Sequence, residues 1–190
     1  MKITRASIWV VGTLLCSLQG AVATPIQWAG NGHWYDAVAV PGNVNWVDAN
    51  ALASSSSYVG LSGHLVTITS AQENAFVATA FPAASGSSSL FGYWLGGRQY
   101  GQGPFQWVTG EAFSFTNWNV GEPNDLAPDE GIHFYGRGTV GLWNDASVTG
   151  WQFPGYIVEY EQSSQVPEPG TLALLGLGLV GLGGSRRRKA

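Results

Sequence analysis

Five side chains that carry a carboxylate or amide oxygen fall within 24 residues of this chain: Glu122, Asn124, Glu130, Asn144 and Asp145. Three of them are acids, and three negative charges brought into one pocket repel one another unless a cation neutralises them. Ca²⁺ suits such a set, because it takes six to eight oxygen ligands, whereas zinc and copper prefer nitrogen and sulfur. The alternative is that all five are ordinary solvated loop residues.

The N-terminus has the pattern of a secretory signal peptide. Lys2 and Arg5 are the only early charges, an apolar run covers residues 6–18, and residues 21–23 supply small side chains for cleavage. We therefore expect residues 1–23 to be removed. Cys16, the single cysteine, follows two leucines inside the apolar run, which argues against a lipid anchor at this cysteine.

The C-terminal tail begins with Val166, Pro167, Glu168 and Pro169, continues with an apolar run over residues 171–184, and ends with the basic residues 186–189. It resembles a PEP-CTERM sorting signal over residues 166–190. The resemblance implies a Gram-negative bacterium that makes exopolysaccharide, an exosortase-type enzyme that cuts near Pro167, and delivery to the cell envelope, outer surface or extracellular matrix. A permanent tail anchor is the alternative, but 14 residues span roughly 21 Å, less than the roughly 30 Å hydrocarbon core. We expect membrane contact only during processing.

Residues 24–165 remain as one expected domain, an ordinary length for a single hydrophobic core. Arg98 and Arg137 are its only arginine or lysine residues, against eleven acids, so its formal charge is −9. This charge excludes a nucleic-acid partner, because binding phosphates requires a basic face. It favours cations, although solvated acids attract them without specificity.

Local patterns predict a mixed domain with a long central loop. A capping box at Ser70–Glu73 predicts a helix that ends before Pro82, and residues 45–53 predict a second, short helix. The stretch between Thr109 and Leu142 has little periodicity and is predicted to be a functional loop. Strand propensity bounded by turn residues predicts strands at residues 33–40, 64–68, 91–95, 105–109 and 156–160.

These segments resemble the C-type lectin-like domain over nearly all of residues 24–165. The matching pieces, in order, are residues 63–68, 73, 93–97, 105–111, 117–118, 121–124, 143–145 and 156–159. The resemblance implies an α+β fold, in which two helices flank small antiparallel sheets and a long loop holds calcium.

The resemblance also implies how the five residues act. In calcium-dependent lectins of this family, the residues that match Glu122, Asn124, Glu130, Asn144 and Asp145 surround one Ca²⁺ and hydrogen-bond two neighbouring sugar hydroxyls, which also ligate the ion. Both asparagines are expected to keep NH₂ donors for the sugar. The Glu-Pro-Asn order resembles the variant that selects equatorial 3- and 4-hydroxyls, as in mannose, N-acetylglucosamine, glucose or fucose, and it implies a cis bond at Pro123.

Two features of the family are missing from this chain. Counting from the motifs places Arg98, Gln102 and Gly131 where a second calcium site would have acids, so we expect that site to be absent. Asp125 remains from it and is interpreted as a solvated loop acid or a long-range contributor to the first ion.

The family's two disulfides are replaced by the pairs Tyr58 with Val158 and Ile132 with Val148. Losing a bridge costs about 2 to 5 kcal/mol, and burying a Val or Ile side chain contributes roughly 1.5 to 3 kcal/mol. We therefore expect apolar contacts at these positions to compensate in a fold without disulfides.

The sequence thus predicts an exported, calcium-dependent carbohydrate-binding protein whose ligand is exopolysaccharide or a mannose-type glycan. The alternative is a structural or protein-binding matrix component in which calcium only orders the loop, and Leu126 offers no aromatic face to a sugar. Enzymatic activity is not expected, because carboxylates committed to calcium are poor proton donors. The three histidines lack the close pairing of zinc ligands, and Trp94, Trp107, Trp118 and Trp143 are assigned to the core.

Overall fold

The computed structural model describes residues 24–86 and 91–162. The predicted signal peptide and the sorting signal, including Val166–Pro169, lie outside the described residues. Among the residues that are described, no helix has both the length and the apolar character needed to cross a membrane.

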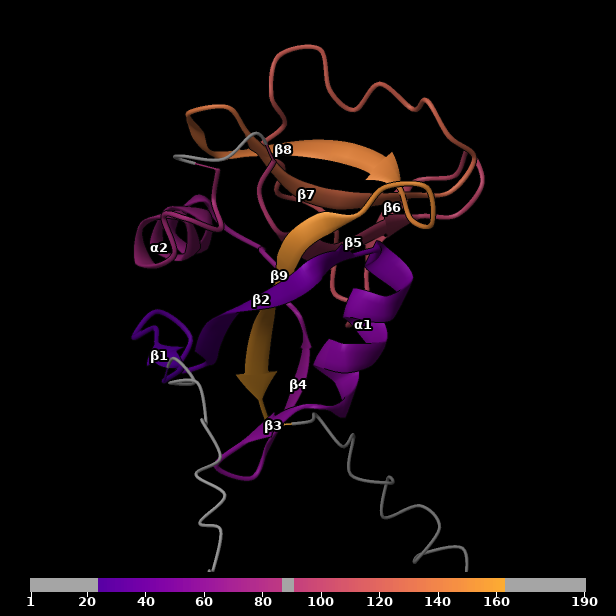
Figure 1. Cartoon of the computed structure of the whole chain (residues 1–190). Coiled ribbons are helices and arrows are strands. Elements are labelled where there is room, and N and C mark those ends of the chain that lie inside the picture. The colour runs from indigo at the N-terminus through magenta and orange to yellow at the C-terminus, as the bar shows by residue number, and fades with distance from the viewer. Residues whose placement is uncertain (1–23, 87–90, 163–190) are drawn as a thin grey trace, which may run out of the picture.

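Two helices and a nine-stranded sheet make up the described domain (Figure 1). The sheet order is β1-β2-β9-β5-β7-β8, and β4 pairs with β9, β6 with β5 and β3 with β4. All of these pairs are antiparallel except β5 with β9. The elements are β1 (Ile26–Gln27), β2 (Trp34–Val44), α1 (Trp46–Ser55), β3 (Ser57–Tyr58), β4 (Leu61–Leu65), α2 (Ala71–Ala80), β5 (Trp94–Gln99), β6 (Phe105–Trp107), β7 (Glu130–Gly136), β8 (Thr139–Ser147) and β9 (Phe153–Glu161).

This arrangement confirms the predicted α+β class. In Figure 1 the helices α1 and α2 lie on opposite sides of the β2–β9 pair, and the chain between β6 and β7 forms the long excursion beside β7 and β8. The excursion therefore lies at the end of the molecule that also carries residues 130 and 145.

Both helices begin at the capping residues that the sequence offers. The Asn45 side chain accepts a hydrogen bond from the Asp48 N–H at 2.8 Å, and Ser70 Oγ accepts one from the Glu73 N–H at 3.2 Å. The Glu73 carboxylate does not close the capping box on Ser70; it accepts the Thr69 N–H at 2.8 Å instead. The predicted start of α2 is therefore correct, while one of its two capping bonds is displaced by a residue.

Two predicted boundaries are wrong. The expected loop between Thr109 and Leu142 contains β7 and the beginning of β8, so only its first part, up to residue 129, is irregular. Nearly every residue of β7 is buried, so this strand lacks the alternation of apolar and polar residues that marks a strand with one solvated face. The strand predicted at residues 33–40 continues to Val44 as β2, and its register on β9 shifts between Ala39 and Val44.

Tryptophan side chains connect the layers of the core. Trp46 Nε1 donates to the Leu95 carbonyl at 2.9 Å, and Trp94 Nε1 donates to the Val44 carbonyl at 2.8 Å, which joins α1, β2 and β5. Trp143 Nε1 donates to Asn74 Oδ1 at 2.8 Å, which joins β8 to α2. Trp94, Trp107 and Trp143 are buried, as expected, and Trp118 is partly buried against the core.

The four residues at the disulfide positions all pack in or against the apolar core. Tyr58 packs against the cluster that contains Val158, and its ring lies 5.8 Å from that of Tyr160. Ile132 and Val148 are both buried, yet they belong to different clusters. The first pair thus lies in or against one cluster, the second is divided between two, and their compensation for the missing bridges stays a prediction.

A polar network fastens α2 to the sheet within this apolar core. Tyr35 Oη lies 2.7 Å from Glu73 Oε1 and 2.9 Å from Glu159 Oε1, so one hydroxyl hydrogen serves two carboxylates. His33 Nδ1 lies 2.7 Å from Glu159 Oε1 and adds a second donor. This hydrogen bond raises the pKa of His33 above 6.5, against the opposing effect of burial.

The raised pKa predicts a pH-dependent contribution of His33 to stability. The folded state favours protonated His33, so the contribution is full below the pKa of the unfolded chain and is lost as the pH rises through the folded value. We expect His33→Gln to lower the free energy of unfolding by up to about 1 kcal/mol at pH 5.5 and by much less at pH 9. Urea unfolding at both pH values measures this difference, and an equal loss at both would contradict it.

Candidate metal and ligand site

Asp145, in β8, lies at the centre of the candidate site and joins it to the long loop. Its side chain is buried, with 4% of the residue exposed. Asp145 Oδ1 accepts the Asn124 N–H at 3.2 Å, and Oδ2 accepts the Asp125 N–H at 2.9 Å. The loop therefore turns its backbone donors toward the sheet at the predicted Glu-Pro-Asn motif, where the Glu122–Pro123 bond is cis, as the resemblance implied.

Glu130 enters the site from the first position of β7, the neighbour of β8. The residue is 1% exposed, and its Oε1 accepts the Ala127 N–H at 2.8 Å. One oxygen each from Asp125, Glu130 and Asp145 lie within 4.8 Å of one another. Three acids from the loop and two strands thus share one small volume.

Asp125 belongs to this group, although the sequence interpretation gave it as a solvated loop acid or a long-range contributor to the first ion. Its backbone has a positive φ of 50°, its N–H donates to Asp145 Oδ2, and Gln99 Nε2 donates to its Oδ1 at 3.0 Å. The sequence contained one sign of this role, since Asp125 directly follows the motif, but these contacts are not readable from residue types.

Several oxygens of the predicted residues are left for a cation to bind. Glu122 Oε2, Glu130 Oε2 and Asn144 Oδ1 are buried and have no hydrogen-bond partner within the described protein. A buried acceptor without a partner is costly, so such atoms in native proteins call for a donor, a water or an ion. Carboxylate and amide oxygens from three separate segments are the donor set that Ca²⁺ prefers, and the residues fit this ion.

The carboxyl groups of the site shift one another's pKa values, as expected for acids that share one pocket. Burial and the neighbouring Asp145 carboxyl raise the pKa of Glu130 to about 8, and the same two causes raise the pKa of Glu122. Burial also acts to raise the pKa of Asp145, but the neighbouring Glu130 carboxyl and hydrogen bonds from the loop amides outweigh it and lower this pKa. The raised pKa values of Glu122 and Glu130 reflect, besides burial, a repulsion between carboxylates that a bound cation would relieve.

The orientation of Asn144 is fixed from behind by a buried histidine. His133 is fully buried, which lowers its pKa to about 3, so the ring is neutral. Its Nδ1 lies 2.6 Å from the Phe134 carbonyl and must donate to it, which leaves Nε2 to accept from Asn144 Nδ2 at 3.0 Å. Asn144 Nδ2 also donates to the Asp145 carbonyl at 2.8 Å. Both amide hydrogens have partners in the described protein, which leaves Oδ1 toward the site, and the sugar donor expected at Asn144 stays a prediction.

The positions of the second calcium site are occupied by packing interactions. The Arg98 guanidinium lies over the rings of Trp46 and Tyr100, with centroids at 5.3 and 4.3 Å, and Gln102 Nε2 donates to the Ala127 carbonyl at 3.3 Å. A Cβ atom added to Gly131 would lie 2.3 Å from Trp46 Cδ1. An acidic side chain at position 131 would therefore collide with the core.

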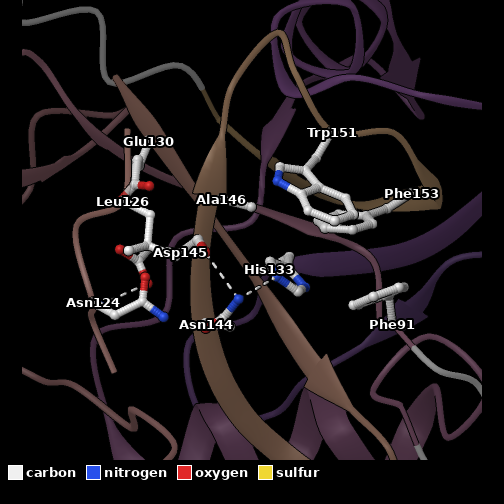
Figure 2. A pocket seen from close by; sticks show the side chains of 10 residues that line it. All are labelled: Phe91, Asn124, Leu126, Glu130, His133, Asn144, Asp145, Ala146, Trp151 and Phe153. Carbon is white, nitrogen blue, oxygen red and sulfur yellow. Dashed lines mark hydrogen bonds between the residues drawn. The ribbon is translucent and has the colours of Figure 1, made fainter. Parts of the chain in front are cut away.

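A pocket of about 110 Å³ opens beside these residues (Figure 2). Asn124, Leu126, Glu130 and Asp145 form one side of it, and Phe91, Trp151 and Phe153 lie on the other side, across the β8 strand that carries Asn144. The predicted residues thus border a concave surface that a ligand could enter.

Comparison with known proteins identifies the class and then the family. The fold is shared with the EPNH mutant of the lectin CEL-I, at a TM-score of 0.55 and 26% identity over 68% of this chain and 89% of that one. The carbohydrate-recognition domain of cow CD23, solved in the presence of a GlcNAc2Man3 oligosaccharide, matches at a TM-score of 0.52 and 26% identity over 67% and 86%. These neighbours define a C-type lectin fold.

The family model for the C-type lectin domain matches residues 43–149, more than half of the chain, and the chain belongs to this family. The mouse C-type lectin domain family 4 member G is 36% identical over 113 residues, which cover 56% of this chain and 35% of the relative. The chain therefore spans about a third of the length of that protein. The PEP-CTERM protein-sorting motif matches residues 165–188, which supports export and sorting to the envelope.

The contact between His133 and Asn144 predicts an effect on metal affinity. We expect His133→Leu to weaken calcium binding about 10- to 100-fold, because the Asn144 amide loses the acceptor that orients it. His133→Gln, which can restore an acceptor, serves as the matched control and should lose less. Calorimetric titration with calcium measures both variants, and native affinity in His133→Leu would contradict the assigned role.

Proposed function

We propose that this protein is an exported carbohydrate-binding protein whose ligand is held through a calcium ion. Glu122, Asn124, Glu130, Asn144 and Asp145 are the proposed metal and sugar ligands, with Asp125 as a further metal ligand. The observation that carries this proposal is the set of buried, unpartnered oxygens on Glu122, Glu130 and Asn144 beside Asp145. A cation would satisfy all three and neutralise the acids at once.

Calcium supplies positive charge and open coordination positions for two neighbouring sugar hydroxyls. The chain supplies the rest of the recognition. The carboxylates of Glu122 and Glu130 accept hydrogen bonds from the hydroxyls, and the exposed side chain of Asn124 donates one. Asn144 contributes its oxygen alone, because His133 and the Asp145 carbonyl hold its two hydrogens. The donor to the sugar is thus placed on the loop and not on β8.

The order of acid and amide in Glu122-Pro123-Asn124 favours mannose-type sugars with equatorial 3- and 4-hydroxyls. We further propose that residues 1–23 are the signal peptide, residues 24–165 the lectin domain and residues 166–190 the sorting signal that an exosortase-type enzyme removes. The ligand is then exopolysaccharide or another glycan at the outer surface or matrix of a Gram-negative bacterium. The carbohydrate named in the cow CD23 structure supports this ligand class.

Calcium binding to the folded state alone should stabilise the protein. At about 100 times its dissociation constant, calcium adds roughly 2.7 kcal/mol to the free energy of unfolding and raises the melting temperature. We expect Asp145→Asn to abolish this increment, because it removes a central charge of the site. Glu111→Gln, at an exposed acid elsewhere, is the matched control and should keep the increment. A full calcium response in Asp145→Asn would show that the ligand assignment is wrong.

Sugar binding is tested by retention on immobilised mannose with calcium and release by EDTA or free mannose. The double variant Glu122→Gln, Asn124→Asp exchanges acceptor and donor on the loop and should lose mannose while it keeps its thermal response to calcium. If the native protein responds to calcium but ignores mannose-type sugars, the lectin proposal fails. A matrix protein whose loop is ordered by calcium is then the better description.

A further inference from the structure

The pocket beside the metal site has a second wall that is built from aromatic rings. Phe91 and Phe153 stack with centroids 5.3 Å apart, and Trp151 lies 5.9 Å from Phe91 and 6.3 Å from Phe153. Figure 2 shows these rings on the opposite side of β8 from Asn124 and Glu130, with Asn144 between the two groups. One concave surface therefore joins a metal-binding half to an apolar half.

Trp151 is the member of this wall that core packing does not explain. Phe153 is buried, and its ring lies 4.4 Å from that of Trp94, so it belongs to the core. Trp151 comes between β8 and β9 and is 52% exposed. An exposed tryptophan at the rim of a pocket presents a large apolar face to whatever occupies that pocket.

Apart from Asn144 Oδ1, which is assigned to the metal, the polar groups between the two halves have no hydrogen-bonding capacity left for a hydroxyl in the aromatic half. Both hydrogens of Asn144 are used, and both ring nitrogens of His133 are paired. A hydroxyl placed against the rings would give up water without gaining a partner, which costs free energy. A methyl group would gain by leaving water. The lining thus selects an apolar group attached to a ligand that is held at the metal half.

We propose that the aromatic wall formed by Phe91, Trp151 and Phe153 is a subsite for the acetyl methyl of an N-acetylated hexose such as N-acetylglucosamine. This inference rests on the proposed function, because the hydroxyls of the same sugar are held at the metal site. The acetamido group at carbon 2 neighbours the 3-hydroxyl, so it extends from the edge of the ring next to the metal contacts. The methyl group at its end is small enough for a pocket of about 110 Å³.

Methyl glycosides of N-acetylglucosamine and glucose are the matched probes, since they share the 3- and 4-hydroxyls and differ at carbon 2. We expect the native protein, in saturating calcium, to bind the N-acetylated sugar about three- to tenfold more tightly, as burial of a methyl group predicts. Trp151→Ala should bring the two affinities together without changing glucose binding, and Trp151→Phe should keep part of the preference. Leu52→Ala, on the exposed side of α1, is the control and should keep all of it.

Equal affinities for the two sugars in the native protein would overturn the subsite while leaving the lectin function in place. A preference that survives Trp151→Ala unchanged would also overturn it. Failure of the native protein to bind either sugar would overturn the proposed function and the subsite together. The calcium-dependent melting temperature of each variant shows that its metal site is still formed.

Discussion

The carboxylate of Asp145 connects the sheet to the loop, and the candidate site depends on that connection. It accepts the backbone N–H groups of Asn124 and Asp125, and it lies against the carboxyl of Glu130. These contacts keep the loop motif beside β8, although Asp145 is about twenty residues away from the motif in the chain. The cost is a concentration of negative charge in a buried place, which makes the same pocket suited to a cation.

The residues around the site hold it in place without adding negative charge and without a disulfide. The neutral ring of His133 uses the hydrogens of Asn144 and directs its oxygen forward, so the site gains an acceptor without another charge. Trp46 and Trp94 tie α1, β2 and β5 together by indole hydrogen bonds to backbone carbonyls. Burial of these large side chains supplies rigidity close to where disulfides would otherwise act. The rigid core then positions the aromatic rings that border the pocket.

Residue patterns predicted the fold class because they are local and ordered. Ser70 and Asn45 mark the two helix starts, and the motifs around Trp94, Trp107 and Trp143 lie in or beside strands. The prediction failed where burial removes the pattern. Strand β7 is buried on both faces and begins with a glutamate and a glycine, so its sequence does not alternate and appeared to be loop. The burial of Ile132 and Val148 agrees with their apolar character, but their division between two clusters depends on the fold and could not be read from their positions in the chain.

The sequence alone determined which oxygen-bearing residues are available, the order of acid and amide at positions 122–124, the absence of a cysteine pair and the family of the fold. Tertiary structure decided which of those oxygens are free. Asp125 joins the group as a fourth acid, and His133 accepts a hydrogen bond from Asn144. The tertiary structure also places Phe91, which precedes the site residues in the chain, and Trp151, which follows them, beside the site. Hydrogen-bond satisfaction and side-chain direction depend on neighbours that are distant in sequence, and folding alone brings those neighbours together.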